Sequence, residues 1–310
     1  MIRFGCEEAH LKLTGQKQKM PYRIDFHLKK NKPKGIAVNS VPIRRSSELF
    51  GLLHVVFFSP EDLQLIKNGP AERRRFIDME LCQLDRLYVQ QLAGYNKCLL
   101  QRNMLLKDLF VHPEYLSTLD VWDSQLCVLG RQIIRQRRAF VEEIAPFIRQ
   151  IHLSLSGGKE ELSISYEPNV EENQMEEALL RSRERDRKMK LTMTGPHRDD
   201  IRFIVRTKGA AGQEQETDIR TFGSQGQQRT AALSVKMAEI EMVKRKTGES
   251  PVLLLDDVLS ELDRSRQTYL LDGIGDIQTL ITCTGLDDLV SRRFHIDQVF
   301  HVVNGTVTKK

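Results

Sequence analysis

The sequence of 310 residues contains two adjacent carboxylates, Asp256 and Asp257, directly after the apolar residues 252–255. An apolar run of this kind is typical of a strand buried on both faces, as in a parallel sheet. Ligands of α/β proteins bind at the carboxyl ends of such strands. There Asp256 could hold Mg²⁺, and Asp257 could orient or deprotonate an attacking water. The alternative is an ordinary strand that ends in a turn, and the pair alone leaves both readings open.

A second candidate site is the segment Ser224-Gln225-Gly226-Gln227. Ser224 is suited to cap a helix, and Gln227, three residues later, completes a capping box. Gly226 leaves the helix entrance without a side chain. Free backbone amides at a helix N-terminus bind anions such as phosphate. The alternative is a well-capped helix with no ligand.

The surrounding sequence predicts the elements that would position these groups. Residues 1–60 read as short strands, and Ser59-Pro60 begins a long, mostly helical stretch that reaches about residue 151. After Gly195-Pro196, strands and helices alternate, which is typical of an α/β fold. The expected strands include residues 22–28, 36–38 and 53–58 within that first stretch, and then 162–166, 200–205, 217–221, 252–255, 278–282, 298–303 and 306–307. The expected helices of the last third are 227–246 and 264–273, with a hairpin loop at 208–212.

The order of these motifs resembles the signature motif, Walker B strand, D-loop and switch segment of ABC-type ATPases in the SMC/Rad50 branch. FGSQGQQRTAALSVKMAE (222–239) and PVLLLDDVLSELD (251–263) are most similar to the RecF family of bacterial recombination mediators. FFSPEDLQLIKNGPAERRRFID (57–78), TGPHRDDI (194–201) and IRFG (2–5) fit the same family. The resemblance therefore covers nearly the whole chain.

The resemblance implies an α/β fold: an ABC-type ATPase head (a P-loop NTPase fold) with an inserted α-helical lobe. Residues 1–60 and 191–310 would form the head, and residues 61–190 would form the helical lobe II. The implied cofactors are ATP and Mg²⁺. The implied roles are Asp256 for the metal, Asp257 for catalysis, and, for the nucleotide, Ser224, Gln225, Gly226, Gln227, Asp263 and Thr282.

The sequence contains no GxxxxGK[ST] phosphate loop. Residues 156–160, Ser-Gly-Gly-Lys-Glu, have the wrong spacing and no hydroxyl residue after the lysine. The family resemblance therefore implies a fold that is incomplete at the N-terminus, through a shortened gene model or a true truncation. We expect weak ATP binding by the chain as written. Asp257 stands where many ABC ATPases have the longer Glu, which predicts slow hydrolysis at most, so enzymatic activity stays open.

Arginines cluster at three places, although the net charge of +5 is too small to indicate nucleic-acid binding by itself. Each cluster is either a solvated helix face or a phosphate-neutralising surface. With the family resemblance, we expect at least one of them to contact DNA. The candidates are Arg73, Arg74, Arg75, Arg135, Arg137, Arg138, Arg185 and Arg187.

The resemblance implies an ATP-dependent homodimer that clamps DNA at gaps or single-/double-strand junctions. RecO- and RecR-like partners would help it load recombinase in replication, repair and the SOS response. One rival is a non-catalytic DNA-binding or scaffold protein, which the missing phosphate loop favours. Another is a different SMC-like ATPase. The sequence lacks the long, sustained heptad array that a long coiled-coil arm requires, which argues against a long-armed SMC protein.

Several other classes are excluded by the sequence. Five widely spaced cysteines form neither a disulfide framework nor a CxxC zinc motif. No secretory signal is visible, and the longest apolar run, residues 49–58, is half the roughly 20 residues of a membrane helix. We therefore expect a cytoplasmic protein that contacts no membrane. His197-Arg198-Asp199 is not a kinase loop, because Ile204 stands where the metal-binding Asn is required.

Overall fold

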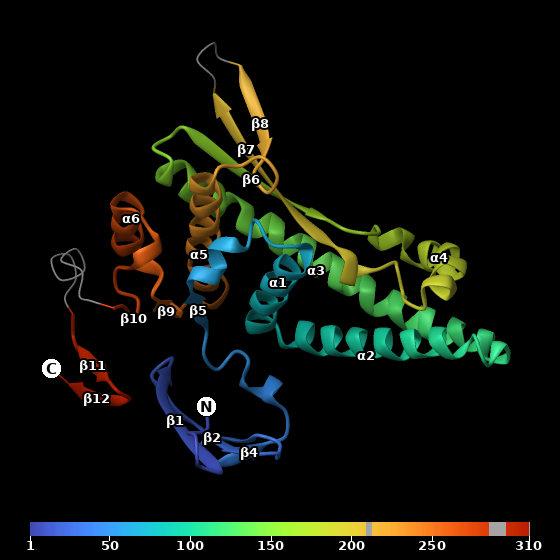
Figure 1. Ribbon diagram of the computed structural model, residues 1–310, viewed down its shortest axis with the longest axis horizontal. Helices are drawn as coiled ribbons and strands as arrows, with labels where there is room; N and C mark the ends of the chain where they lie inside the picture. Colours follow the sequence, from blue (N-terminus) through green and yellow to red (C-terminus); the bar gives the residue numbers. More distant parts are fainter. Residues whose placement is uncertain (209–212, 285–295, 310) are drawn as a thin grey trace. The chain divides into compact units, whose positions relative to one another are not determined.

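The computed structural model describes residues 1–208, 213–284 and 296–309, and Figure 1 colours its helices and strands along the chain. The chain forms two compact units. Unit 1 comprises Met1–His54, Arg75–Arg138 and Pro168–Asp199. Unit 2 comprises Val55–Arg74, Ala139–Glu167 and Asp200–Lys310. The division at residues 60 and 190 into head and lobe stays a prediction about the functional parts.

Unit 1 combines an antiparallel sheet with helices. Its elements are β1 (Glu8–Lys17), β2 (Met20–Lys29), β3 (Gly35–Val38), β4 (Val41–Ile43), α2 (Arg86–Asp108) and α4 (Met175–Met189). Helices α1 (Pro70–Leu84) and α3 (Leu119–Leu155) contribute residues to both units.

The sheet of unit 1 is a meander in the order β1-β2-β3-β4. Its first strand, β1, lies in the stretch 1–60 that the sequence predicts as short strands, although the bounds of this strand were not predicted. The turn between β1 and β2 consists of Gln18 and Lys19, both with positive φ (49° and 66°). Two-residue hairpin turns of this left-handed kind usually contain Asn-Gly or Asp-Gly. The sequence therefore carries no recognisable turn signal at this hairpin.

Buried ion pairs hold the helices of unit 1. Arg102 on α2 is fully buried and donates to Asp123 on α3 (2.6 Å) and to Asp186 on α4 (2.7 Å). It also donates to the hydroxyl of Thr192 (2.9 Å). A buried guanidinium requires such partners because an unpaired charge in the interior is very costly.

Unit 2 contains the predicted α/β alternation. Its strands are β5 (Val55–Phe58), β6 (Glu160–Glu167), β7 (Asp200–Lys208), β8 (Glu214–Asp218), β9 (Val252–Asp256), β10 (Thr279–Thr282), β11 (Phe300–Val303) and β12 (Thr306–Lys309), and its helices are α5 (Gln225–Thr247) and α6 (Arg264–Ile274). The hairpin loop expected at 208–212 lies almost entirely outside the described residues.

The central sheet of unit 2 has the order β10-β9-β5, and both pairings are parallel. The parallel setting predicted for residues 252–255 is thereby confirmed. Leu253 and Leu255 are buried, whereas Val252 and Leu254 are half-buried, so the two faces are covered unequally. Helix α5 is buried on every side from Thr230 to Ile240, which is typical of a helix inside a domain core.

Two further strand sets complete unit 2. Strands β6, β7 and β8 form an antiparallel sheet, and β11 pairs with β12. Strand β8 ends at Asp218, three residues before the predicted end, because the amides of Thr221 and Phe222 turn back to the Asp218 carbonyl. That turn leads the chain toward the start of α5. Among the described residues, no helix has both the length and the hydropathy needed to span a membrane.

Candidate nucleotide site and nucleic-acid interface

The predicted metal ligand Asp256 lies at the carboxyl end of β9, opposite Thr282 at the end of β10. The Thr282 hydroxyl donates to Asp256 Oδ1 (2.5 Å). The backbone N–H of Asp257 donates to Thr282 through both its carbonyl and its hydroxyl oxygen, each at 3.1 Å. The sheet thus brings Asp256, Asp257 and Thr282 together at one rim. Asp256 is exposed there, so a carboxylate oxygen is available to a cation.

Asp257 adopts a left-handed backbone conformation, with φ of 52° and ψ of 19°. Asp is one of the few residues that tolerate this region, because its short side chain can bond locally. The bend starts the short helix η6 (Val258–Glu261), and Ser260 Oγ donates to the Asp257 carbonyl (2.7 Å). Among the described residues, the Asp257 carboxylate makes no hydrogen bond or ion pair, which leaves it open to a water molecule or ligand.

Ser224 caps α5, as its spacing to Gln227 predicts. Ser224 Oγ accepts from the backbone N–H of Gln227 (3.1 Å), and Gln227 Oε1 accepts from the backbone N–H of Ser224 (2.9 Å). Ser224, Gln225 and Gly226 are exposed. The cap moves the helix start to Gln225, two residues before the predicted start. This helix N-terminus is open to solvent and carries the positive end of a 23-residue helix dipole.

Asp263, which follows η6, is connected to the N-terminal turn of α5 through Arg266, a residue that was not predicted from the sequence. Asp263 caps α6 by accepting from the Arg266 amide (3.0 Å) and forms an ion pair with the Arg266 side chain. Arg266 Nη2 also donates to Thr230 Oγ1 (2.6 Å) and to the Gly226 carbonyl (3.3 Å). An Arg three residues after an N-cap Asp was the available signal, but its partners lie 36 and 40 residues earlier in the chain.

Arg229 forms a second connection between α5 and η6. Its guanidinium donates to the carbonyl (3.0 Å) and to the carboxylate (3.1 Å) of Glu261. A cavity of about 330 Å³ opens beside this pair. It is lined by Pro60, Glu61, Gln64, Lys67, Gln225, Gln228, Arg229 and Glu261. All the lining residues except Pro60 have polar side chains, and Gln225 belongs to the exposed first turn of α5.

Gln227 extends the network into the interior of unit 2. The side-chain Nε2 of Gln227 donates to Glu160 Oε1 (2.9 Å). Glu160 Oε2 lies 3.6 Å from Nε2 of the buried His152. On its other side, His152 Nδ1 meets Ser234 Oγ (3.2 Å). Burial lowers the pKa of His152 to about 4, against the attraction of the Glu160 carboxylate. His152 is therefore a neutral imidazole at pH 7.

The arginines expected at a DNA interface fall into different environments. Arg73 and Arg137 are buried, with 0% and 3% of their surfaces exposed. Arg73 binds Asp200 through two hydrogen bonds (2.6 and 3.0 Å), and Arg137 binds Asp78 and Asp199. Neither guanidinium is accessible to a phosphate in this structure, so, contrary to the expectation, both are structural groups that hold carboxylates inside their units.

The remaining candidates, which are exposed or half-buried, differ in their partners. Three of them form ion pairs: Arg135 with Glu172, Arg138 with Glu171, and Arg187 with Glu184. Arg74 is half-buried. Arg75 and Arg185 are exposed, and neither has a side-chain partner among the described residues.

The side chains of the TGPHRDDI segment make structural contacts in both units. His197 Nε2 donates to the Thr192 carbonyl (2.9 Å), so Nδ1 is the acceptor of the Tyr95 hydroxyl (2.7 Å). Asp199 is buried beside Arg137 in unit 1, and Asp200 binds Arg73 in unit 2. These contacts leave no catalytic task for the HRD sequence.

Comparison with known proteins places this geometry in a family, although no protein-family model matches the chain. The DNA replication and repair protein RecF of Agathobacter rectalis is 55% identical over 307 residues, covering 99% of this chain and 82% of the relative. RecF of Lachnoclostridium phytofermentans is 54% identical over 100% and 83% of the two chains. RecF of Clostridium perfringens is 40% identical over 99% and 83%.

Solved structures agree with the sequence comparison. The recombination mediator protein RecF of the RecFOR pathway, with ATP, superposes with a TM-score of 0.88 at 33% identity, covering 99% of this chain and 81% of that chain. A second RecF structure, with an ATP analogue, has a TM-score of 0.87 at 34% identity over the same shares. An Smc head matches at 14% identity with a TM-score of 0.51, which concerns the fold alone. The α/β fold is thus that of an ABC-type ATPase head, and the chain belongs to the RecF family of DNA replication and repair proteins.

Proposed function

We propose that this protein is a DNA-binding ATPase that acts as a recombination mediator in replication and repair. The observation that carries the proposal is the pairing of two features in unit 2. The first feature is the Asp256 carboxylate at the end of the central parallel strand, which accepts a hydrogen bond from Thr282. The second is the exposed N-terminus of α5, which Ser224 of the RecF-like signature caps. The relatives named above support the same function, since RecF structures with ATP belong to a recombination-mediator pathway.

The donor set at the sheet rim fits Mg²⁺, which prefers carboxylate and hydroxyl oxygens. Asp256 would hold the ion with Thr282 beside it, and the bound ion would neutralise phosphate charge. Asp257, with its unpaired carboxylate, would orient or deprotonate the attacking water. The Ser224 hydroxyl and the amides of Gln225 and Gly226 would bind a terminal phosphate.

The proposal assigns these two groups to opposite sides of one nucleotide. In a dimer of two heads, Asp256 of one copy and Ser224 of the other would enclose the same triphosphate. The Arg266 and Arg229 contacts would hold the signature helix tip in register with Asp263 and Glu261 while the phosphate is bridged. Loss of the bridging phosphate would then release the two copies.

The proposal for DNA rests on exposed basic groups. Arg75 and Arg185 would neutralise backbone phosphates, with weaker contributions from Arg74, Arg135, Arg138 and Arg187, most of which are already paired. RecO- and RecR-like partners and a gapped or branched DNA are inferred from the pathway named for the RecF structures. Such a task places the protein in the cytoplasm, where chromosomal DNA is accessible.

The test is nucleotide-dependent dimerisation, measured by size-exclusion chromatography with light scattering. Because the 310 residues contain no GxxxxGK[ST], the chain is compared with one that a strand–phosphate loop–helix unit precedes. With MgATP, the extended chain should dimerise. Ser224→Arg should abolish the dimer while nucleotide binding survives, and Ser154→Arg, an exposed serine of the same unit, should leave it intact. Unchanged dimerisation of Ser224→Arg would refute the role of the helix tip.

The exposed guanidinium groups of Arg75 and Arg185 can bind DNA phosphates without a nucleotide, which gives a second candidate function, that of a nucleotide-independent DNA-binding scaffold. A titration of gapped duplex DNA with and without MgATP separates the two functions. The ATPase switch requires that nucleotide changes the DNA affinity of the extended chain. Equal affinity in both titrations supports the scaffold.

A further inference from the structure

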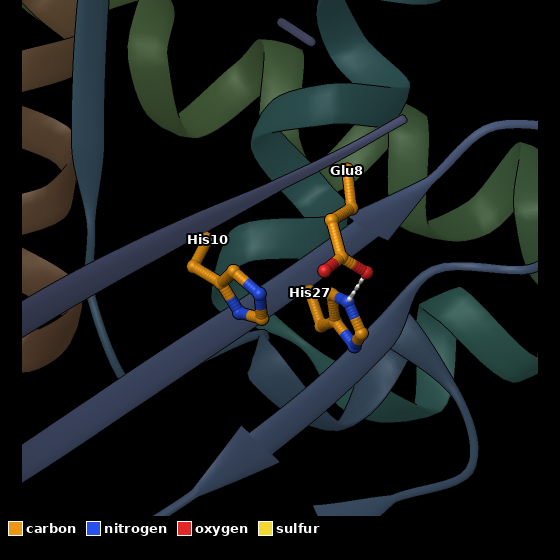
Figure 2. Close-up of side chains that lie close together, drawn as sticks. All are labelled: Glu8, His10 and His27. Atoms are coloured by element: carbon orange, nitrogen blue, oxygen red, sulfur yellow. Dashed lines mark hydrogen bonds and ion pairs between the residues drawn. The ribbon is translucent and has the colours of Figure 1, made fainter. Parts of the chain in front are cut away.

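Three side chains on one face of the β1–β2 hairpin have the chemistry of a transition-metal site. His10 on β1 lies directly opposite His27 on β2 in the strand register, and Glu8 is two residues from His10 on the same face. The imidazole rings of His10 and His27 are stacked, with their centroids 4.2 Å apart. Figure 2 shows the Glu8 carboxylate turned toward His27, whose Nε2 lies 3.1 Å from Glu8 Oε2.

The spacing of the three potential ligand atoms is close to what one ion requires. One nitrogen of each imidazole and one carboxylate oxygen lie within 4.8 Å of one another. Two bonds of about 2.0–2.1 Å at a tetrahedral angle separate ligand atoms by about 3.4 Å. The three side chains are exposed, so side-chain rotation can close this difference without moving the backbone.

The hairpin itself supplies preorganisation. Ten cross-strand residue pairs hold β1 and β2 in a fixed register, so the Cβ atoms of His10 and His27 face each other before any ligand arrives. Neighbouring residues of an antiparallel pair have Cβ atoms about 4.5–5.5 Å apart. Binding of a metal ion between the two side chains would therefore cost the chain little conformational entropy.

We propose that Glu8, His10 and His27 bind one Zn²⁺ ion, with water in the open coordination position. Two neutral imidazoles and one carboxylate are a ligand set that proteins use for this ion. Lys29 is the competing group, because its ammonium lies 3.6 Å from Glu8 Oε2 and must turn away when the ion binds. Lys29 is itself exposed, so water can take over its solvation. The bound ion would cross-link β1 to β2.

The 310-residue chain, freed of metal with a chelator, tests the site by calorimetric titration with Zn²⁺ and by Co²⁺ absorption. We expect one ion per chain. His10→Gln and His27→Gln should each weaken binding at least about tenfold, because loss of a direct ligand costs no less than loss of a supporting one. Zn²⁺ should raise the Tm of the parent chain and not that of His27→Gln.

Two control variants isolate the cluster. His112 pairs with Glu114 (3.0 Å) as an exposed imidazole–carboxylate pair, and no second imidazole joins it in the part of the chain that the structure describes, so His112→Gln should keep full binding. Cys6 is an exposed thiol two residues before Glu8, so Cys6→Ser must also keep it. No saturable binding, binding that survives the His10→Gln/His27→Gln double variant, or loss of binding in Cys6→Ser would each overturn the proposal.

Discussion

Acidification should destabilise this protein through His152, which the fold buries completely. Ser234 Oγ uses its only proton to donate to the Thr230 carbonyl (2.7 Å), so it must accept from His152 Nδ1–H. Nε2 is then without a proton and has no hydrogen-bond partner. Protonating it would place a charge in the interior, and the carboxylate of Glu160 at 3.6 Å is too distant to compensate fully.

The magnitude follows from the difference in pKa between the unfolded and folded chains. The pKa of His152 is lowered from 6.5 to about 4, which corresponds to about 3 kcal/mol of unfolding free energy. Because the folded pKa is the lower one, the unfolded chain binds the proton first. The stabilisation is therefore complete above about pH 6.5 and is lost as the pH falls toward 4.

Urea unfolding of the parent chain and of His152→Asn, each at pH 7.5, 5.5 and 4.5, measures this contribution. Asn keeps a donor toward Ser234 but cannot titrate. The parent chain should lose most of these roughly 3 kcal/mol relative to the variant by pH 4.5, with the difference growing as the pH falls. Ser154→Asn, which changes no titratable group, should follow the parent chain.

Two results would refute the reasoning on His152. Equal slopes for the parent chain and His152→Asn would mean that His152 titrates in the folded protein as it does in the unfolded chain. A parent chain that gains stability relative to the variant on acidification would mean that the pair with Glu160 is ionic. In that case Gln227, which shares Glu160, would be held by a charged network.

Three further changes have expected outcomes. Arg102→Met should lower the free energy of unfolding by about 3–5 kcal/mol in chemical denaturation, because it leaves the buried carboxylate of Asp186 without its ion pair. The control Arg181→Met, at an exposed arginine, should change the free energy of unfolding little. Gly195→Ala should cost more than about 2 kcal/mol in the same assay, because φ is 136° and the new Cβ would clash with the Tyr95 hydroxyl; a near-neutral result would contradict this geometry. Arg185→Gln should weaken DNA binding uniformly across sequences and reduce the salt slope by about 1, and an unchanged slope would exclude a phosphate contact there.

The elements that the sequence predicts well are those with local signals. The apolar run before Asp256 predicts a central parallel strand, and the Ser224–Gln227 spacing predicts the cap of α5 at Ser224, where it is found. The bounds of strand β1 were not predicted within the strand-rich stretch 1–60, because Gln18 and Lys19 form its turn without the usual residues. The sequence also could not reveal Arg266, since its acceptors on α5 come from a distant part of the chain.

Runs of arginine were the least informative feature of the sequence, and helical geometry explains why. Consecutive residues of a helix point about 100° apart, so a run of three cannot present one surface. On α1, Arg73 is buried, Arg74 is half-buried and Arg75 is exposed. The number of arginines in a run therefore says little about the charge offered to a ligand.

The same geometry shows which basic groups DNA would have to compete for. On α3, Arg135 and Arg138 are three residues apart and share a face, whereas Arg137 turns inward. That shared face already meets Glu172 and Glu171 from the chain before α4. A phosphate would have to displace a carboxylate from each of these arginines, so little net charge is gained there. The uncompensated guanidinium of Arg75 offers a full charge, which makes it the stronger candidate for a DNA contact.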